Sequence, residues 1–240
     1  SFDVLAPLMK NCAVAAIDQA GVGFSDFRPK SATYHLWDDV LDILAIADGL
    51  GWQNFILLGH SRGAMLSVLL AAAEPTRVKQ LMLIDGLLPM PVDANHAAKQ
   101  LANYVHDYRR PKRDRKKRYK NREEAIALRI KAANLPVRIA SILAQRNLKE
   151  ENGEYFWHVD DRLKAASAIK LSHEHNVSFL SAVNCPVRVV VANQGMGAHD
   201  KFKEMMQTFP WIYWHLMDGH HHLHMDEQAQ EIAKLCEAHW

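Results

Sequence analysis

The sequence lacks the features that mark two large classes of protein. No stretch approaches the ~18 uninterrupted apolar residues that a membrane-spanning helix needs. The formal net charge is only +2 over 240 residues, which is too small to indicate a nucleic-acid partner. We therefore expect neither a membrane span nor nucleic-acid binding. A hydrophobic share of 49% is ordinary for a globular chain that buries a sizeable core.

Cysteine is scarce as well. The three cysteines, Cys12, Cys185 and Cys236, are odd in number and do not have the spacing of a metal site. Reduced structural thiols fit this pattern, which favours a cytoplasmic protein. The residues from Ser1 to Leu5 do not form the charged and apolar regions of a secretory signal, and a targeting segment upstream of them is left open.

One short motif carries most of the chemical information. The pentapeptide Gly59-His60-Ser61-Arg62-Gly63 joins an apolar run at residues 55–58 to a helical pattern that begins at residue 64. A Gly-x-Ser-x-Gly between a strand and a helix presents the serine hydroxyl on a strained turn, where the two glycines avoid Cβ clashes. The next backbone N–H can then stabilise an oxyanion. This context favours Ser61 as a nucleophile over an ordinary turn or N-cap serine.

Short apolar runs alternate with helical patterns in the first and last parts of the chain. We predict strands at 12–17, 55–58, 81–84, 186–191 and 211–217, and helices at 37–50, 64–73 and from 226 onwards. Such alternation predicts a parallel sheet covered on both faces. Residues 1–86 and 184–240 are expected to form this core.

The intervening range, residues 87–183, has only helical or irregular signals and several prolines. We interpret it as an inserted helical cap over the carboxyl ends of the strands, where open α/β sheets place their sites.

The chain resembles the α/β-hydrolase superfamily and is similar to its serine hydrolase-like members of the lipase and esterase type. The matching segments, which span nearly the whole chain, are residues 17–26, 58–63, 83–86, 157–163 and 219–224. The resemblance implies the α/β-hydrolase fold, a mostly parallel sheet with helices on both faces and an inserted helical cap. It also implies a serine nucleophile, a histidine base, an orienting carboxylate and two backbone N–H donors, without a cofactor.

The base implied by the resemblance follows the last strand, where the sequence offers four histidines. The register of the family motif selects His221, with His220 and His222 as alternatives and local packing as the expected role of His224. Clustered imidazoles can also bind zinc, but adjacent histidines cannot all face one ion, so no metal site is expected.

The acid is less well determined. The family most often carries it after the strand that follows the cap, but Gly195 stands at that position, and Asp200 comes five residues later. Asp85, at the end of the strand after the motif serine, is the alternative that we favour. If Asp85 has a structural role instead, it caps the turn into the inserted range. Asp218 is a remote third candidate for the acid.

The second oxyanion donor departs from the family pattern. The backbone N–H of Arg62 supplies one donor, whereas the His-Gly loop that supplies the other is absent from this sequence. By the family's strand order, a further strand belongs between those at 12–17 and 55–58. Unpaired backbone in mid-sheet costs ~1 to 3 kcal/mol per buried group. We therefore expect an upstream segment or a separate chain to complete the sheet.

Three features of the inserted range have structural interpretations. The basic run at 109–118 is expected to be a solvated stretch rather than a nucleic-acid or lipid site. Trp157 and residues 160–163 match a family motif and are expected to pack the cap onto itself rather than to contact the substrate. Met90, Tyr104, Tyr108 and Phe179 could line an acyl pocket or simply pack in the core.

The sequence thus predicts a serine hydrolase that cleaves a small or medium ester through an acyl-enzyme on Ser61. Its partner is a small-molecule substrate, and Ser61 disfavours the branches that use an aspartate nucleophile. The alternative is a non-catalytic binding protein on the same fold.

Overall fold

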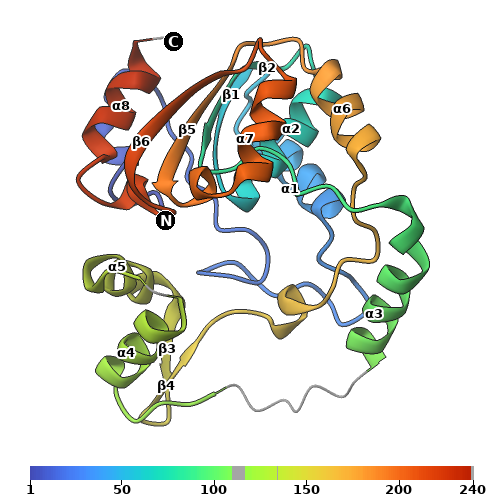
Figure 1. The fold of residues 1–240 in the computed structure, drawn as a ribbon. Coiled ribbons are helices and arrows are strands. Elements are labelled where there is room, and N and C mark those ends of the chain that lie inside the picture. Colours follow the sequence, from blue (N-terminus) through green and yellow to red (C-terminus); the bar gives the residue numbers. More distant parts are fainter. Residues whose placement is uncertain (110–116, 134, 239–240) are drawn as a thin grey trace.

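The computed structural model describes residues 1–109, 117–133 and 135–238 of the chain (Figure 1). Its main sheet has four parallel strands in the order β1-β2-β5-β6. They are β1 (Phe55–His60), β2 (Val78–Ile84), β5 (Val187–Gln194) and β6 (Tyr213–His220). The strands predicted at these four places are confirmed. Their carboxyl ends meet at one edge of the sheet, which is where such sheets place their sites.

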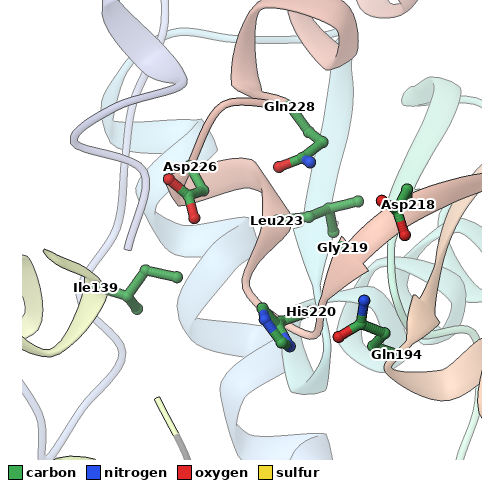
Figure 2. A pocket seen from close by; sticks show the side chains of 8 residues that line it. All are labelled: Ile139, Gln194, Asp218, Gly219, His220, Leu223, Asp226 and Gln228. Atoms are coloured by element: carbon green, nitrogen blue, oxygen red, sulfur yellow. The ribbon is translucent and has the colours of Figure 1, made fainter. Parts of the chain in front are cut away.

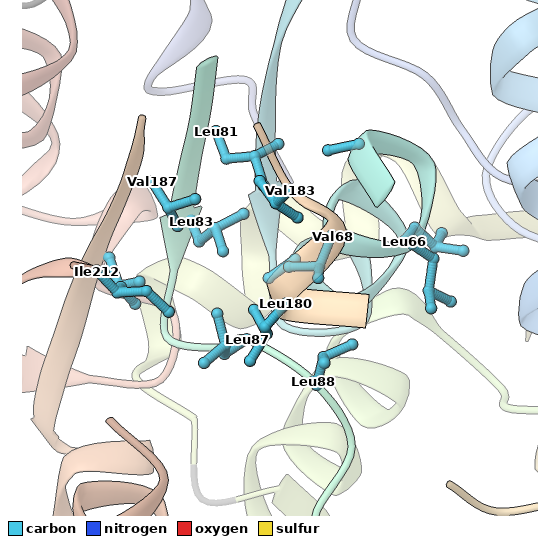
Figure 3. Packing of buried hydrophobic residues seen from close by; sticks show 14 of the residues in the cluster. Leu66, Val68, Leu81, Leu83, Leu87, Leu88, Leu180, Val183, Val187 and Ile212 are labelled. Atoms are coloured by element: carbon cyan, nitrogen blue, oxygen red, sulfur yellow. The ribbon is translucent and has the colours of Figure 1, made fainter. Parts of the chain in front are cut away.

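Helices cover both faces of the sheet, as predicted. Alternate residues of β2 point to opposite faces: Leu81 and Leu83 belong to one buried cluster, and Met82 and Ile84 to another. The first cluster, drawn in Figure 3, packs the sheet against α1, α2, α6 and α7, and the second packs it against α8. These helices are α1 (Leu36–Gly49), α2 (Arg62–Ala73), α6 (His173–Ala182), α7 (Asp200–Thr208) and α8 (Ala229–Glu237).

The strand predicted at residues 12–17 is wrong. This apolar segment has no strand assignment and its side chains are exposed, with Val14 at 44% and Ile17 at 40%. A strand forms only when a neighbour satisfies its backbone groups, and among the described residues β1 pairs with β2 alone. The segment and β1 instead line one cavity of about 1920 Å³.

The inserted range is not wholly helical. Its helices are α3 (Ala97–Arg109), α4 (Arg122–Ala133) and α5 (Val137–Asn147), followed by the antiparallel hairpin of β3 (Leu148–Glu151) and β4 (Glu154–Trp157). The hairpin corrects the prediction of helical or irregular structure. Asn152 and Gly153 form its turn with φ of 54° and 75°, the left-handed pair that a tight hairpin requires. Short 3₁₀ helices are η1 (Ala6–Leu8), η2 (Ala94–His96), η3 (Asp161–Lys164), η4 (Met196–Ala198) and η5 (Leu223–Met225).

The inserted range is fastened to the loop at residues 18–34. Asp160 accepts a hydrogen bond from the Tyr34 hydroxyl at 2.8 Å, and Arg162 donates to the carbonyls of Pro29 and Ala32 at 2.8 and 2.9 Å. The expectation that this motif packs the cap onto itself is therefore wrong for these two residues. In Figure 1, α4, α5 and the hairpin lie beyond the carboxyl ends of the strands.

Two other expectations concern the basic run at 109–118 and membrane-spanning helices. Seven residues of the basic run, 110–116, lie outside the described residues. Within the described ranges, no helix is both long enough and apolar enough to cross a membrane.

Candidate active site

Ser61 occupies a strained turn between β1 and α2. Its φ of 53° is rare for a residue with a side chain, and such strain is kept where the surroundings enforce it. A Cβ at Gly59 would lie 2.4 Å from the carbonyl oxygen of Gly63, and one at Gly86 would lie 2.8 Å from that of Ser61. The turn is therefore tight at Gly59 and Gly86. At Gly63 a Cβ would meet nothing within 4 Å, so the prediction that both motif glycines avoid clashes is correct only for the first.

Three predicted residues form one chain of hydrogen bonds. The Ser61 hydroxyl is 2.9 Å from Nε2 of His221, and Nδ1 of the same ring is 2.6 Å from Oδ2 of Asp85. Asp85 is completely buried, and its Oδ1 accepts the backbone N–H groups of Ala192 at 2.9 Å and Met196 at 3.0 Å. These two backbone donors fix the position of the carboxylate. The His221 ring therefore donates its Nδ1–H to Asp85, and its Nε2 accepts the hydroxyl proton of Ser61.

The alternative acids lie elsewhere. Asp200 begins α7, where its side chain is 90% exposed and pairs with Lys203 at 3.4 Å. Asp218 accepts a hydrogen bond from the Asn193 amide at 2.7 Å. Neither is joined to His221 by a hydrogen bond within the described part of the chain.

The neighbouring histidines pack around His221 as neutral rings. His60 donates Nε2–H to the backbone carbonyl of His221 at 2.7 Å, and the rings of His60 and His224 are 4.2 Å apart. Burial, with the nearby histidines, lowers the pKa of His60 and of His224 well below the ordinary value. Burial also lowers the pKa of His222 to about 4. No sequence signal pointed to the contact of His60, because it depends on how two distant loops meet.

Metal binding was the other interpretation of the histidine cluster. Among the described residues, no group of three or more His, Cys, Asp or Glu side chains is arranged to hold a metal ion. Neither ring nitrogen of buried His224 has a hydrogen-bond partner in this part of the chain. The arrangement suits packing of neutral imidazoles.

Ser61 and His221 open into the cavity of about 1920 Å³ that also borders β1. The inserted range contributes apolar side chains to it, among them Leu128, Leu143, Trp157 and Leu163, together with charged ones such as Arg129. The four residues considered for an acyl pocket do not line it. Tyr104 and Tyr108 contact each other at 4.8 Å between ring centroids, and Phe179 lies against Trp37.

A second cavity, of about 200 Å³, lies beside the loop at residues 219–226 (Figure 2). Its lining is largely polar and includes Gln194, Asp218, His220 and Gln228. Because neither Ser61 nor His221 lines it, this cavity is separate from the hydrogen-bonded chain.

Known proteins of two kinds, sequence relatives and solved structures, are similar to this chain. The sequence profile of the family described as alpha/beta hydrolase fold matches residues 2–122. The chain is 26% identical to a serine hydrolase-like protein of Danio rerio, over 94% of this chain and 73% of that protein. It is 27% identical to a probable serine hydrolase of Drosophila melanogaster, over 98% and 76%.

Solved structures are similar as well. The crystal structure of a hypothetical protein from Pseudomonas aeruginosa PAO1 matches with a TM-score of 0.94 at 38% identity, over 99% of this chain and 86% of that one. A thioesterase domain from the curacin biosynthetic pathway matches with a TM-score of 0.76 at 23% identity, over 91% and 78%. This second likeness shows the shared fold alone.

Proposed function

This chain belongs to the α/β hydrolase fold family, and we propose that it is a serine hydrolase that cleaves a small or medium carboxylic ester through an acyl-enzyme on Ser61. The names of the relatives support hydrolysis in general. The finer proposal depends on one observation, the hydrogen-bonded chain from Ser61 through His221 to buried Asp85.

The first half of the reaction acylates the serine. Oγ of Ser61 attacks the ester carbonyl carbon while its proton moves to Nε2 of His221. The tetrahedral intermediate collapses when the same nitrogen returns the proton to the leaving alkoxide, which departs as the alcohol. Asp85 holds Nδ1–H and stabilises the imidazolium that forms in between.

The second half repeats the relay with water. His221 removes a proton from a water molecule, which attacks the acyl carbon, and then protonates Oγ of Ser61 as the carboxylic acid leaves. The negative oxygen of each intermediate is stabilised by the backbone N–H of Arg62. This N–H is at the first residue of α2, where helix donors have no partner within the helix and the dipole favours an anion.

We assign two further roles within this proposal. The inserted range acts as a cap, because its apolar side chains line the cavity into which Ser61 opens. The cytoplasm is the expected location, since Cys12, Cys185 and Cys236 are all free thiols.

Hydrolysis of p-nitrophenyl butyrate by the full-length protein tests the proposal. Wild type should turn the ester over, and Ser61→Ala should lose on the order of 10⁶ in rate while keeping its circular dichroism spectrum. Ser67→Ala is a matched control, because its hydroxyl donates to the Gly63 carbonyl within α2. Turnover that survives in Ser61→Ala would exclude the acyl-enzyme, and a folded wild type without turnover would favour the non-catalytic binding protein.

A further inference from the structure

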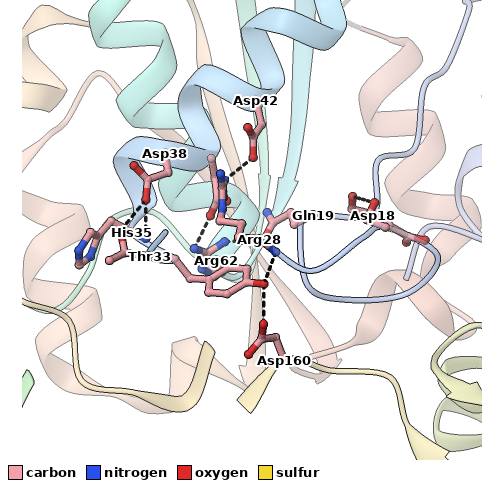
Figure 4. Close-up of polar contacts among 12 residues, drawn as sticks. Asp18, Gln19, Arg28, Thr33, His35, Asp38, Asp42, Arg62 and Asp160 are labelled. Carbon is pink, nitrogen blue, oxygen red and sulfur yellow. Dashed lines mark hydrogen bonds and ion pairs between the residues drawn. The ribbon is translucent and has the colours of Figure 1, made fainter. Parts of the chain in front are cut away.

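The side chain of Arg62, the residue after the proposed nucleophile, is engaged at both ends of its guanidinium. Nη1 donates to the side-chain oxygen of Gln19 at 2.5 Å, and Nη2 forms an ion pair with Oδ2 of Asp39 on α1 (Figure 4). Asp39 is 2% exposed. Arg62 is thus tied to two elements outside the turn that it follows.

Asp39 is held in turn by a second arginine. Its Oδ1 accepts Nη2 of Arg28 at 3.0 Å, so one buried carboxylate lies between two guanidinium groups. The Arg62 side chain is 35% exposed and Arg28 also pairs with Asp42, so neither arginine depends on Asp39 as a wholly buried charge. What holds Arg62 is a fixed carboxylate at one end of its guanidinium and Gln19 at the other. The pairing therefore restrains Arg62 rather than merely attracting it.

The same contacts continue to the inserted range. The backbone N–H of Arg28 donates to the Tyr34 hydroxyl at 2.8 Å, and that hydroxyl donates to Asp160 at 2.8 Å. Arg162 donates to the carbonyl of Arg28 at 2.5 Å. An unbroken series of contacts thus joins Asp160 of the inserted range to Arg62 through Tyr34, Arg28 and Asp39. Figure 4 labels Asp160, Arg28 and Arg62 of this series.

We infer that Asp39 is a positioning residue, which fixes Arg62 and through it the backbone N–H that faces the oxyanion; this inference rests on the proposed function. Oxyanion donors accelerate a reaction because they are already oriented before charge develops. The peptide between Ser61 and Arg62 follows a strained residue, with φ of 53° at Ser61. A side chain anchored at its far end keeps this peptide from turning its N–H away.

Asp39→Asn tests the inference, with Asp48→Asn at the other end of α1 as the matched control. Asp48 is exposed and pairs with Arg77. It takes no part in the series of contacts that joins Asp160 to Arg62. With p-nitrophenyl butyrate, Asp39→Asn should lower kcat by about 10- to 100-fold and leave KM within about two-fold, since misplaced groups affect the transition state most. The affinity for an alkylboronic acid, which mimics the tetrahedral anion, should fall by the same factor as kcat.

A second variant covers the case in which Asp39→Asn does not fold. Arg62→Met keeps the backbone donor and removes the guanidinium, so it should show the same fall in kcat and in boronate affinity. Normal kcat and normal boronate affinity in either folded variant would overturn the inference while leaving the proposed function intact. A folded wild type without ester turnover would overturn both.

Discussion

Asp85 and Gly195 share one space at the carboxyl edge of the sheet. A Cβ at Gly195 would lie 2.2 Å from Oδ2 of Asp85 and 2.9 Å from its Cγ. The backbone N–H of Met196, the next residue, is 3.0 Å from both carboxylate oxygens. The position where the resemblance places an acid is thus without a side chain, and the carboxylate that reaches His221 comes from the neighbouring strand β2.

This relationship predicts that Gly195→Ala damages the enzyme. A Cβ at Gly195 would overlap the Asp85 carboxylate, and this overlap is the expected cause of the effect. We expect a fall of at least 10-fold in kcat for p-nitrophenyl butyrate, because even small displacements of a catalytic group are costly. Gly49→Ala is the control, since a Cβ there meets nothing within 4 Å. Equal kcat in the two variants would show that Asp85 does not need this space.

The acid itself is tested by Asp85→Asn. Loss of the carboxylate leaves His221 without the partner that orients its tautomer, and about 10⁴ in kcat is the expected cost. Asp200→Asn should be close to wild type, because that side chain is 90% exposed on α7. If steady-state kinetics found Asp200→Asn the worse of the two, the acid would have been assigned to the wrong strand.

Substitutions at His221 and at His224 should distinguish a catalytic role from a packing role. His221→Ala should lose nearly as much activity as Ser61→Ala, because it removes the group that moves the proton. His224→Leu should keep most of its activity, since neither of its ring nitrogens is hydrogen-bonded within the described residues. The reverse order of kcat values would move the base to His224.

Because His60 and His224 are buried, we predict that the free energy of unfolding falls at acid pH. Burial lowers the pKa of each in the folded chain well below the ordinary value of about 6.5 that holds after unfolding. Below pH 6.5 the unfolded chain therefore binds more protons than the native one. The stabilisation is fully present above pH 6.5 and is lost as the pH falls, by up to about 1.4 kcal/mol per pH unit for each histidine.

Urea unfolding at pH 7.5 and pH 5 measures this effect. The free energy of unfolding should be lower at pH 5, and His224→Leu should reduce the difference between the two values. His96→Asn, at an exposed position, should leave the difference unchanged. A pH dependence that is identical in wild type and His224→Leu would contradict the assignment of His224 as a buried neutral ring.

The gap beside β1 predicts an additional strand. Residues 13–17 and 55–59 line the same cavity, and within the described residues β1 has a sheet neighbour on one side only. We propose that a strand from outside these 240 residues, of the same or of another polypeptide, pairs there. Hydrogen exchange should be fast at 13–17 and at the β1 amides that face away from β2 when the 240 residues are expressed alone, and slow once the additional strand is present. Protected amides and full ester turnover in the 240-residue chain alone would contradict this.

Some parts of the structure are dictated by a local pattern in the sequence. The turn at Ser61 could be predicted because its glycines and flanking runs lie within a few residues, and His221 followed from the register of the family motif. The hairpin at residues 148–157 was missed although its Asn152-Gly153 turn was a usable signal. The choice between Asp85 and Asp200 needed three dimensions, because it depends on Gly195 and on backbone donors of another strand. Likewise, nothing in the local sequence joins Asp39 to Arg62.

Covalent labelling with a fluorophosphonate tests directly whether Ser61 is an activated nucleophile. Intact mass spectrometry of the full-length protein should show one adduct, mapped by proteolysis to the peptide that contains Ser61. Ser61→Ala should not react, and His221→Ala should react far more slowly because the hydroxyl has no base. A folded wild type that stays unlabelled, or an adduct on a different serine, would contradict the claim.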